Sequence, residues 1–351
     1  MNERQIGAKV SLAVKYRPKC WEDVTEQSVV KDILENQVKT KTVQSAYLFT
    51  GPSGTGKTTS ARIFASMIND GKGNPIEVDA ASNSGVDNIR QIIEDAKRKP
   101  LDAEYKIFIV DECHSLSDSS WQALLKTLEE PPKFTIFIFC TTDPQKIPAT
   151  ILSRVQRYNF QKISNEGVYG RLNTILEKES EEIDNLSCQL NWEKDALEFI
   201  AKVSSGGMRD AITLLDKCLS LSHDVTLENV LKTIGSEDYG TFITFLSSLG
   251  KKEKEVSIKV IEDVYTAGKD VKQFMKDFSK FILEVGKYSL YKNFDYISLP
   301  NTLENELEQL IDDSLFDIMD FVVSLNNQIK WENDAKTLIE LSILIYCGKE
   351  I

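Results

Sequence analysis

The most informative segment of this chain is Gly51-Pro52-Ser53-Gly54-Thr55-Gly56-Lys57-Thr58. It fits the pattern G-x-x-x-x-G-K-[ST], in which glycines let backbone N–H groups point at phosphate oxygens. An apolar strand is expected before it, over residues 46–50, and a helix after it, from Thr59 to Ala65. Strand, glycine-rich turn and helix form the context that a phosphate-binding loop (P-loop) needs, which disfavours a chance glycine turn.

The P-loop predicts an ATP site. All eight loop residues and Thr59 are candidates for holding the nucleotide, since the helix that opens near Lys57 adds the positive end of its dipole. The Lys57 ammonium is expected to reach the β- and γ-phosphates, and the Thr58 hydroxyl to bind Mg²⁺.

A second predicted strand, residues 106–110, ends in two carboxylates. Asp111 is expected to hold Mg²⁺ and Glu112 to polarise the attacking water. An acidic pair that merely caps a strand end is the alternative. The presence of a P-loop in the same chain favours the catalytic interpretation.

The composition is that of an ordinary globular protein, with 351 residues, 41% of them hydrophobic and 27% charged. Neither a membrane-spanning stretch nor the apolar core of a signal peptide is visible, so we expect a cytoplasmic location and no membrane contact. The 6 cysteines form no C-x-x-C pair and there are only 2 histidines, so we expect no zinc site.

The net charge of −12 is unevenly distributed along the chain. Residues 1–163 hold 22 Lys and Arg against 20 Asp and Glu, whereas residues 164–351 hold 20 against 34. The excess of negative charge argues against indiscriminate nucleic-acid binding. Any contact with DNA is therefore expected to be local and to lie mainly in the first region.

Hydrophobic periodicity divides the chain into three regions. Over residues 1–163, apolar strands alternate with helices, which predicts an α/β domain with a parallel sheet covered on both faces. Strand signals nearly vanish after Phe160, so 164–236 and 237–351 are expected to be helical. Two apolar stripes in the last region are expected to form helix–helix core, with packing between subunits as the alternative. They comprise Phe274, Phe278, Phe281, Ile282 and Val285, and then Leu307, Leu310, Ile311 and Phe316.

Several further motifs resemble, in order and spacing, the clamp-loader branch of the AAA+ ATPases. The similarity is greatest to the gamma/tau subunits of bacterial DNA polymerase III, and more distant to the small subunits of replication factor C. It is strong over residues 11–235 and faint over 237–351. The motifs are Tyr16-Arg17-Pro18, Asp79-Ala80-Ala81-Ser82, Leu125-Lys126-Thr127-Leu128-Glu129-Glu130-Pro131-Pro132, Thr141-Thr142-Asp143-Pro144, Ile151-Leu152-Ser153-Arg154 and Gly207-Met208-Arg209-Asp210.

This resemblance implies three domains: an AAA+ ATPase domain (1–163), a helical lid (164–236) and a helical collar for oligomerisation (237–351). It also implies roles for three residues. Thr142 matches sensor 1, which detects the γ-phosphate, and Arg209 matches sensor 2 of the lid. Arg154 matches the arginine finger that one subunit supplies to its neighbour. The segment that wraps the adenine is matched by Tyr16, Arg17 and Val24, for which a packed N-terminal arm is the alternative.

DNA contacts are expected where a helix begins after the second strand, because small polar residues there offer N–H groups to phosphates without reading bases. The candidates are Ser82, Asn83, Ser84 and Arg90. For Lys97-Arg98-Lys99 we favour a solvated helix end over a DNA contact.

The chain departs from the gamma/tau pattern in three ways. The four-cysteine zinc module usual in bacteria is replaced by a connection without cysteine, residues 63–75. Ser153-Arg154 is followed by Val155 in place of cysteine, which leaves the arginine in position. The long tail of the tau form is missing, so we expect the family's usual link to polymerase and helicase to be missing too. Such a short chain would suit a compact replication system, for example of phage type.

The predicted function is that of an ATPase subunit of a sliding-clamp loader, which opens the clamp and loads it on primer–template DNA during replication. The expected partners are the clamp, this DNA and other subunits of a pentameric ring. One alternative is an AAA+ DNA helicase or remodeller, which should have a pore loop or DNA-reading hairpin. Another is a non-hydrolysing structural subunit of the same ring, which should have a degraded P-loop or lack Glu112.

Overall fold

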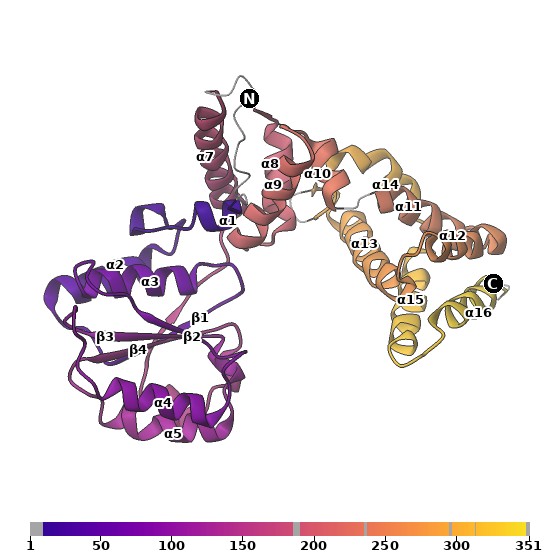
Figure 1. Cartoon of the computed structure of the whole chain (residues 1–351). Helices are drawn as coiled ribbons and strands as arrows, with labels where there is room; N and C mark the ends of the chain where they lie inside the picture. The colour runs from indigo at the N-terminus through magenta and orange to yellow at the C-terminus, as the bar shows by residue number, and fades with distance from the viewer. Residues whose placement is uncertain (1–9, 185–189, 235–236, 295–296, 313, 349–351) are drawn as a thin grey trace, which may run out of the picture. The chain divides into compact units, whose positions relative to one another are not determined.

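A parallel β-sheet forms the framework of the first of two units, residues 1–226 and 227–351 (Figure 1). The computed structural model describes residues 10–184, 190–234, 237–294, 297–312 and 314–348. Within them the sheet has five strands in the order β2-β3-β4-β1-β5. Their bounds are β1 Ala46–Thr50, β2 Ile76–Asp79, β3 Lys106–Asp111, β4 Thr135–Thr141 and β5 Gln156–Asn159.

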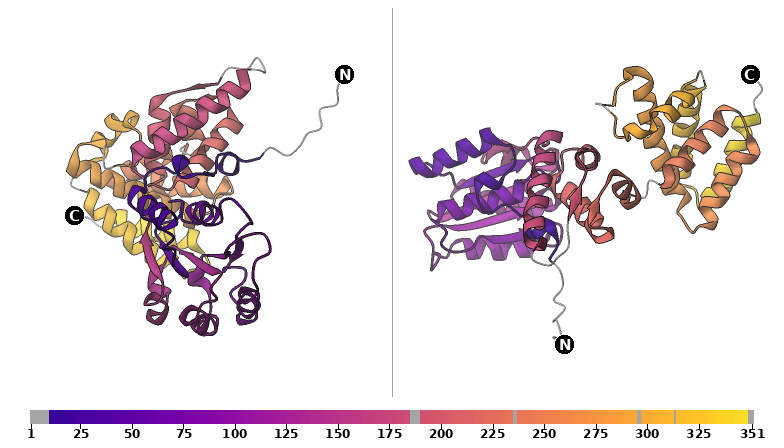
Figure 2. Two further views of the ribbon diagram at one scale, coloured as in Figure 1. Left: turned by 90° about the vertical axis from the view of Figure 1, so that its left-hand side faces the viewer. Right: turned by 90° about the horizontal axis from the view of Figure 1, so that it is seen from above.

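Helices cover both faces of this sheet (Figures 1 and 2). Along β1, Tyr47 and Phe49 pack with α2 (Ser28–Thr40) and α3 (Lys57–Ile68), whereas Leu48 packs with α4 (Val86–Ala96) and α5 (Asp118–Glu129). The central strands are buried on both faces, which explains their uninterrupted apolar sequences. The α/β fold predicted from the sequence is confirmed.

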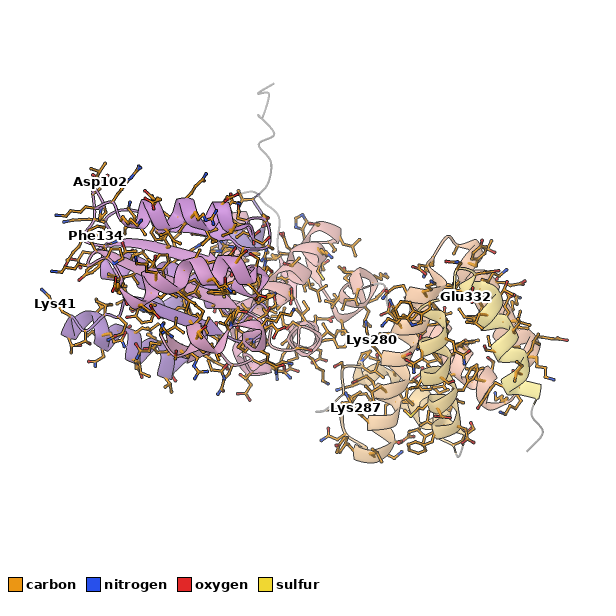
Figure 3. The ribbon with its side chains drawn as sticks, turned by 90° about the horizontal axis from the view of Figure 1, so that it is seen from below. Lys41, Asp102, Phe134, Lys280, Lys287 and Glu332 are labelled. Carbon is orange, nitrogen blue, oxygen red and sulfur yellow. The ribbon has the colours of Figure 1, made fainter. Side chains whose placement is uncertain are left out.

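The parallel pairing places the carboxyl ends of the strands at one edge of the sheet. Thr50 of β1 lies opposite Thr141 of β4, and Asp79 of β2 lies opposite Asp111 of β3. Segments that lead into the strands gather at the other end of the unit, where Lys41, Asp102 and Phe134 lie (Figure 3). Side chains just after β1, β3 and β4 are therefore brought together at the first edge.

The rest of the first unit is mainly helical. The N-terminal arm, residues 11–17, contains α1 (Leu12–Lys15), and η1 (Trp21–Asp23) follows it. Within the sheet domain lie η2 (Cys113–Ser115), η3 (Pro144–Lys146) and α6 (Ala149–Leu152). After the sheet come α7 (Asn165–Asp184), α8 (Lys194–Val203) and α9 (Met208–Leu221), which are called the lid helices below because they fall in the predicted lid. Two strands of two residues each, β6 (Asn191–Trp192) and β7 (Asp224–Val225), form a small parallel pair that is too short to leave a periodic signal.

The second unit is helical throughout its described residues. It comprises α10 (Leu227–Ile234), α11 (Glu237–Gly250), α12 (Lys254–Thr266), α13 (Val271–Tyr291), η5 (Asn301–Leu303), α14 (Glu304–Leu310), α15 (Leu315–Ile329) and α16 (Ala335–Gly348). All five residues of the first predicted stripe are buried, and the ring centroids of Phe245 and Phe278 lie 4.8 Å apart.

The second stripe was predicted wrongly at its last residue. Leu307 and Leu310 are buried and Ile311 packs against the core, but Phe316 is 60% exposed. The reason is that α14 ends at Leu310 and α15 begins at Leu315, so the helical phase restarts. In α15, Leu315 and Ile318 face the core instead. The predicted domain boundaries after residues 163 and 236 stay predictions. In the described ranges, none of the helices is sufficiently long and apolar to cross a membrane.

Candidate nucleotide-binding site

The P-loop joins β1 to α3 and owes its shape to three glycines. Gly51, Gly54 and Gly56 have φ angles of +147°, +74° and +96°, which side chains rarely allow. A Cβ atom at Gly51 would lie 2.3 Å from the carbonyl oxygen of Phe160, and one at Gly54 would lie 3.0 Å from Cα of Gly207. The loop thus needs glycine both for its turn and for close packing.

Lys57 opens α3 and is buried beneath the loop. Its Nζ donates hydrogen bonds to the carbonyl oxygens of Gly51 and Pro52, both at 2.8 Å. Burial lowers the pKa of Lys57, and the carboxylates of Glu112 and Asp111 oppose this shift. The ammonium is therefore held against the carbonyl oxygens of the loop's first two residues.

Thr58 and Asp111 are brought together, as expected for a pair that binds Mg²⁺. The Thr58 hydroxyl donates to Oδ2 of Asp111 at 2.9 Å, across 53 positions of sequence. Hydroxyl and carboxylate oxygens are the hard ligands that Mg²⁺ prefers, and phosphate and water commonly supply the remaining ones. The donor set fits Mg²⁺, although its binding stays a prediction.

Glu112 adopts a left-handed conformation, with φ of +45°, directly after β3. The hydroxyl of Thr142 donates to its Oε2 at 3.2 Å, so the predicted sensor and the predicted base are in contact. His114 was missed: its Nδ1 lies 3.3 Å from the same oxygen and 3.0 Å from the Thr141 hydroxyl. The 3-10 turn after Glu112 places the His114 ring next to the Glu112 carboxylate. Strand and helix periodicity do not reveal a turn this short.

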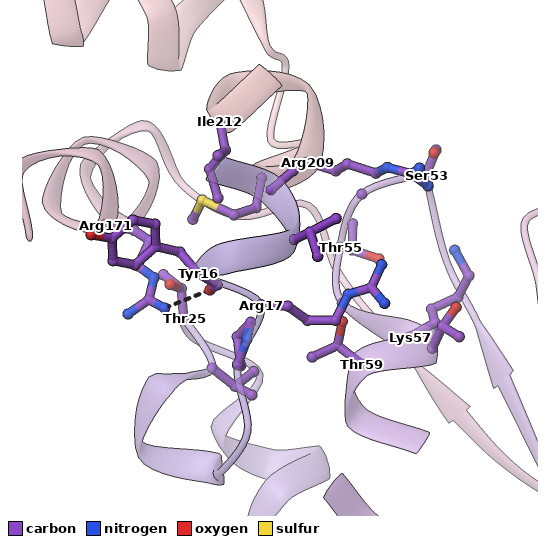
Figure 4. Close-up of a pocket in the computed structure, with 18 of the residues that line it drawn as sticks. Tyr16, Arg17, Thr25, Ser53, Thr55, Lys57, Thr59, Arg171, Arg209 and Ile212 are labelled. Atoms are coloured by element: carbon purple, nitrogen blue, oxygen red, sulfur yellow. Dashed lines mark hydrogen bonds between the residues drawn. The ribbon is translucent and has the colours of Figure 1, made fainter. Parts of the chain in front are cut away.

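A pocket of about 360 Å³ lies over the P-loop, between the N-terminal arm and the lid helices (Figure 4). Its lining contains most of the predicted nucleotide-binding residues: Tyr16, Arg17, Val24, Ser53, Gly54, Thr55, Gly56, Lys57, Thr58, Thr59, Asp111, Glu112 and Arg209. Ile212 and Thr213 also line it. They lie one helical turn after Arg209, so helical spacing could have identified them.

Two further arginines of the pocket were also missed. Arg171 of α7 donates to the carbonyl oxygen of Tyr16 at 3.0 Å (Figure 4) and pairs with Asp23 at 3.5 Å. No local pattern distinguishes it. Arg62 lies four residues after Thr58 on α3, a spacing that predicts the same helix face, and pairs with Glu77 at 2.5 Å.

Arg154 is not among the residues that line the pocket. Its guanidinium pairs with Glu129 of α5 at 2.5 Å and donates to the carbonyl oxygen of Thr150 at 2.6 Å. The structure thus does not place it on the P-loop of its own chain. Its role as a finger for a neighbour stays a prediction.

The DNA-contact candidates lie on the turn before α4 and on its first turns. The hydroxyl of Ser82 donates to Asp79 at 2.9 Å, and the backbone N–H of Asn83 bonds the Asp79 carbonyl at 3.0 Å. Ser84 accepts a bond from Ser120 through its carbonyl oxygen. Arg90 pairs with Asp87 and Lys97 with Glu94. These contacts order the turn; whether it touches DNA stays a prediction.

Comparison with known proteins identifies similar sequences and folds. One family model, described as the delta subunit of DNA polymerase III, matches residues 74–164. Another, the ATPase lid domain of a DNA polymerase III clamp loader subunit, matches residues 168–224.

Among curated proteins, the tau subunit of DNA polymerase III from Bacillus subtilis is 34% identical over 95% of this chain and 62% of its own length. The gamma subunit from Buchnera aphidicola subsp. Acyrthosiphon pisum is 30% identical over 78% of this chain and 80% of its own length. The chain spans about half the length of several curated relatives that it matches.

Among solved structures, the Holliday junction branch migration motor RuvB of Thermotoga maritima matches with a TM-score of 0.50 and 22% identity. The match covers 67% of this chain and 79% of that one. At this identity the likeness concerns the fold alone.

Proposed function

This chain belongs to the family of DNA polymerase III gamma/tau subunits, and we propose that it acts as an ATPase subunit of a sliding-clamp loader. The observation that carries the proposal is the group formed by Lys57, Thr58, Asp111, Glu112 and Thr142 in one site. A chain that only supported a ring would not need a complete hydrolytic group. The sequence match to a clamp-loader lid over 168–224 favours loading over DNA remodelling.

Each residue of the site would have one task during hydrolysis. The Lys57 ammonium would exchange the carbonyl oxygens of Gly51 and Pro52 for oxygens of the β- and γ-phosphates. Mg²⁺, held by Thr58 and Asp111, would neutralise charge on the transferring phosphoryl group. Glu112 would orient the attacking water and accept its proton, and Thr142 would donate a hydrogen bond to the γ-phosphate. Arg209 would reach the phosphates from the lid.

In the assembly, Arg154 would act on the ATP of a neighbouring subunit. We propose a pentameric ring in the cytoplasm that contacts the clamp, primer–template DNA and companion subunits, with the turn at Ser82, Asn83 and Ser84 and the side chain of Arg90 on the DNA. ATP with Mg²⁺ would be its cofactors, and it would hold no structural zinc. A neighbour's guanidinium makes hydrolysis depend on assembly, which suits a switch.

ATP turnover by the assembled complex tests this function, measured with and without primed DNA plus the cognate clamp. We expect stimulation only when both are present. Glu112→Gln should keep ATP binding and lose about 10²- to 10⁴-fold in turnover, because an amide cannot accept the proton. Lys57→Ala is the control that should not bind ATP.

Two results would contradict the proposal. ATP binding without any turnover in the full complex would indicate a structural subunit. Turnover stimulated by branched DNA with no need for the clamp would indicate a remodeller.

A further inference from the structure

We propose that Arg17 binds the α- and β-phosphates of the nucleotide and thereby fastens the N-terminal arm to the P-loop helix. The inference rests on the proposed function in assuming that a nucleotide occupies the P-loop. It differs from the adenine-wrapping role that the family resemblance implies for Arg17.

The Arg17 guanidinium is half-buried and has no direct partner among the residues that the structure describes. Its side chain lines the pocket and extends toward α3 next to Thr59 (Figure 4). Across the described ranges of the chain, no hydrogen bond or ion pair engages this guanidinium. Arg62 and Arg171, in the same pocket, pair with Glu77 and Asp23. A partly buried cation that no carboxylate contacts directly has an energetic cost that a bound anion would reduce.

The charges around Arg17 also favour an anion. Burial lowers the pKa of Arg17, and the guanidinium groups of Arg62 and Arg209 lower it further, whereas the carboxylates of Glu77 and Asp111 act against this shift. Arg209 extends from α9 toward Ser53 of the P-loop (Figure 4). Arg17, Arg62 and Arg209 thus all line the pocket over the loop, and their mutual repulsion, which Glu77 reduces at Arg62, favours a bound anion. An uncharged adenine ring would leave this repulsion in place.

The position of Thr59 indicates which phosphates Arg17 would contact. Consecutive helical side chains point about 100° apart. Thr58 is directed at Asp111, toward the end where the γ-phosphate and Mg²⁺ would lie. Thr59, beside Arg17, therefore faces a different side of the helix start. On this side the α- and β-phosphates, which ATP and ADP share, would lie.

The N-terminal arm also contacts helices α7 and α9. The backbone N–H of Leu12 donates to Asp216 of α9 at 3.1 Å, and Lys15 pairs with Glu179 of α7 at 2.6 Å. Arg171 of α7 holds the carbonyl oxygen of Tyr16. A phosphate bound by Arg17 would therefore link the P-loop helix to the lid through the arm, for ADP as well as for ATP.

Equilibrium binding of ATP, ADP and inorganic tripolyphosphate tests the inference with Arg17→Gln, Arg17→Lys and the exposed control Lys19→Gln. We expect Arg17→Gln to weaken all three ligands by roughly 10-fold or more, the effect of losing a charge-assisted hydrogen bond. Arg17→Lys should recover part of the loss, because it keeps the charge but not the planar fork. Lys19→Gln, which changes the net charge equally, should bind as the wild type does.

Hydrogen exchange of the arm gives a second readout. Saturating ADP should slow exchange in residues 11–16 of the wild type and of Lys19→Gln, but much less in Arg17→Gln. Thermal melts without nucleotide verify folding, and Arg17→Gln should melt at or above the wild-type temperature, because one repelling charge is gone. If Arg17→Gln melts well below the wild-type temperature, the binding and exchange measurements on Arg17→Lys replace those on Arg17→Gln.

Three outcomes would overturn the inference. Unchanged affinities for ATP and ADP would show that Arg17 contacts no phosphate. A loss confined to ATP would place it at the γ-phosphate, and a loss of ATP and ADP affinity with normal tripolyphosphate binding would place it at the nucleoside. If the wild-type chain binds neither ATP nor ADP, the proposed function is refuted as well. If the wild type binds both and Arg17→Gln binds them with the same affinity, only this inference is refuted.

Discussion

Gly51 is the P-loop position that tolerates a side chain least. Its φ of +147° and the carbonyl oxygen of Phe160, 2.3 Å from a would-be Cβ, both oppose any side chain. Phe160 lies directly after β5, next to β1 in the sheet. A methyl group at position 51 would therefore push the loop away from the edge where the phosphates are expected to bind.

We expect Gly51→Ala to lower the free energy of unfolding by about 1–3 kcal/mol and to abolish nucleotide-induced stabilisation. Gly170→Ala is the matched control. Gly170 lies within α7, with no heavy atom within 4 Å of the added methyl group, so alanine should raise stability by about 0.5–1 kcal/mol. Urea denaturation of both variants with and without ADP measures the difference. A Gly51→Ala protein with wild-type stability and ADP response would contradict this account of the loop.

Asp111 and Glu112 illustrate how neighbouring carboxylates acquire different environments. Asp111 ends β3 and accepts from Thr58, whereas Glu112 turns into a left-handed conformation and meets Thr142 and His114. The change of backbone conformation between them directs one side chain to the P-loop helix and the other to the end of β4. Two roles can therefore follow from two adjacent acids.

At the scale of elements, the N-terminal arm depends on tertiary contacts, because α1 has only 4 residues and cannot be stable alone. Leu12 is fully buried, and its N–H bonds Asp216 of α9. Lys15 and Tyr16 then reach α7 through Glu179 and Arg171. The arm is thus ordered by the lid helices.

Leu12→Ala should release the arm, since a large-to-small change in a core costs about 2–5 kcal/mol. The expected result is faster tryptic cleavage after Lys15 under native conditions. Val14→Ala is the control on the same helix, because Val14 is 57% exposed and should be cleaved at the wild-type rate. Equal cleavage rates for the two variants would show that Leu12 does not anchor the arm.

At the scale of the whole molecule, Arg154 is the residue that we propose to complete the nucleotide site of a neighbouring chain. Arg154 pairs with Glu129 and lies outside the pocket of its own chain, which is compatible with action in a neighbour. Arg154→Ala should keep ATP binding but lose about 10³-fold or more of the stimulated hydrolysis. ATPase assays of the reconstituted complex with primed DNA and clamp measure this loss.

Mixing Arg154→Ala with Lys57→Ala distinguishes action in trans from action in cis. Each variant lacks a different half of an interface, so some mixed interfaces join an intact P-loop to an intact Arg154. Partial recovery of turnover is the expected result. Lack of recovery in proven mixed assemblies would assign Arg154 a role within its own chain, and full activity of an isolated monomer would rule out the ring.

Features that depend on neighbours along the chain could be predicted from the amino-acid sequence. The glycines of the P-loop, the apolar runs of β1, β3 and β4 and the buried stripe of α13 follow from backbone sterics and periodicity, which act over a few residues. The same local reasoning failed at Phe316, where a break between α14 and α15 restarted the helical phase.

The set of distant residues that share the nucleotide pocket could not be predicted in this way, because folding brings them together. Arg171 meets Tyr16 across 155 positions, and Thr142 meets Glu112 across 30. Strand register and the packing of the arm on the lid create these meetings, and neither leaves a periodic trace in the sequence. The unpaired state of Arg17 likewise depends on which acids are already engaged by Arg62 and Arg171. Whether Arg17 has a partner is therefore set by where folding places the carboxylates around the pocket.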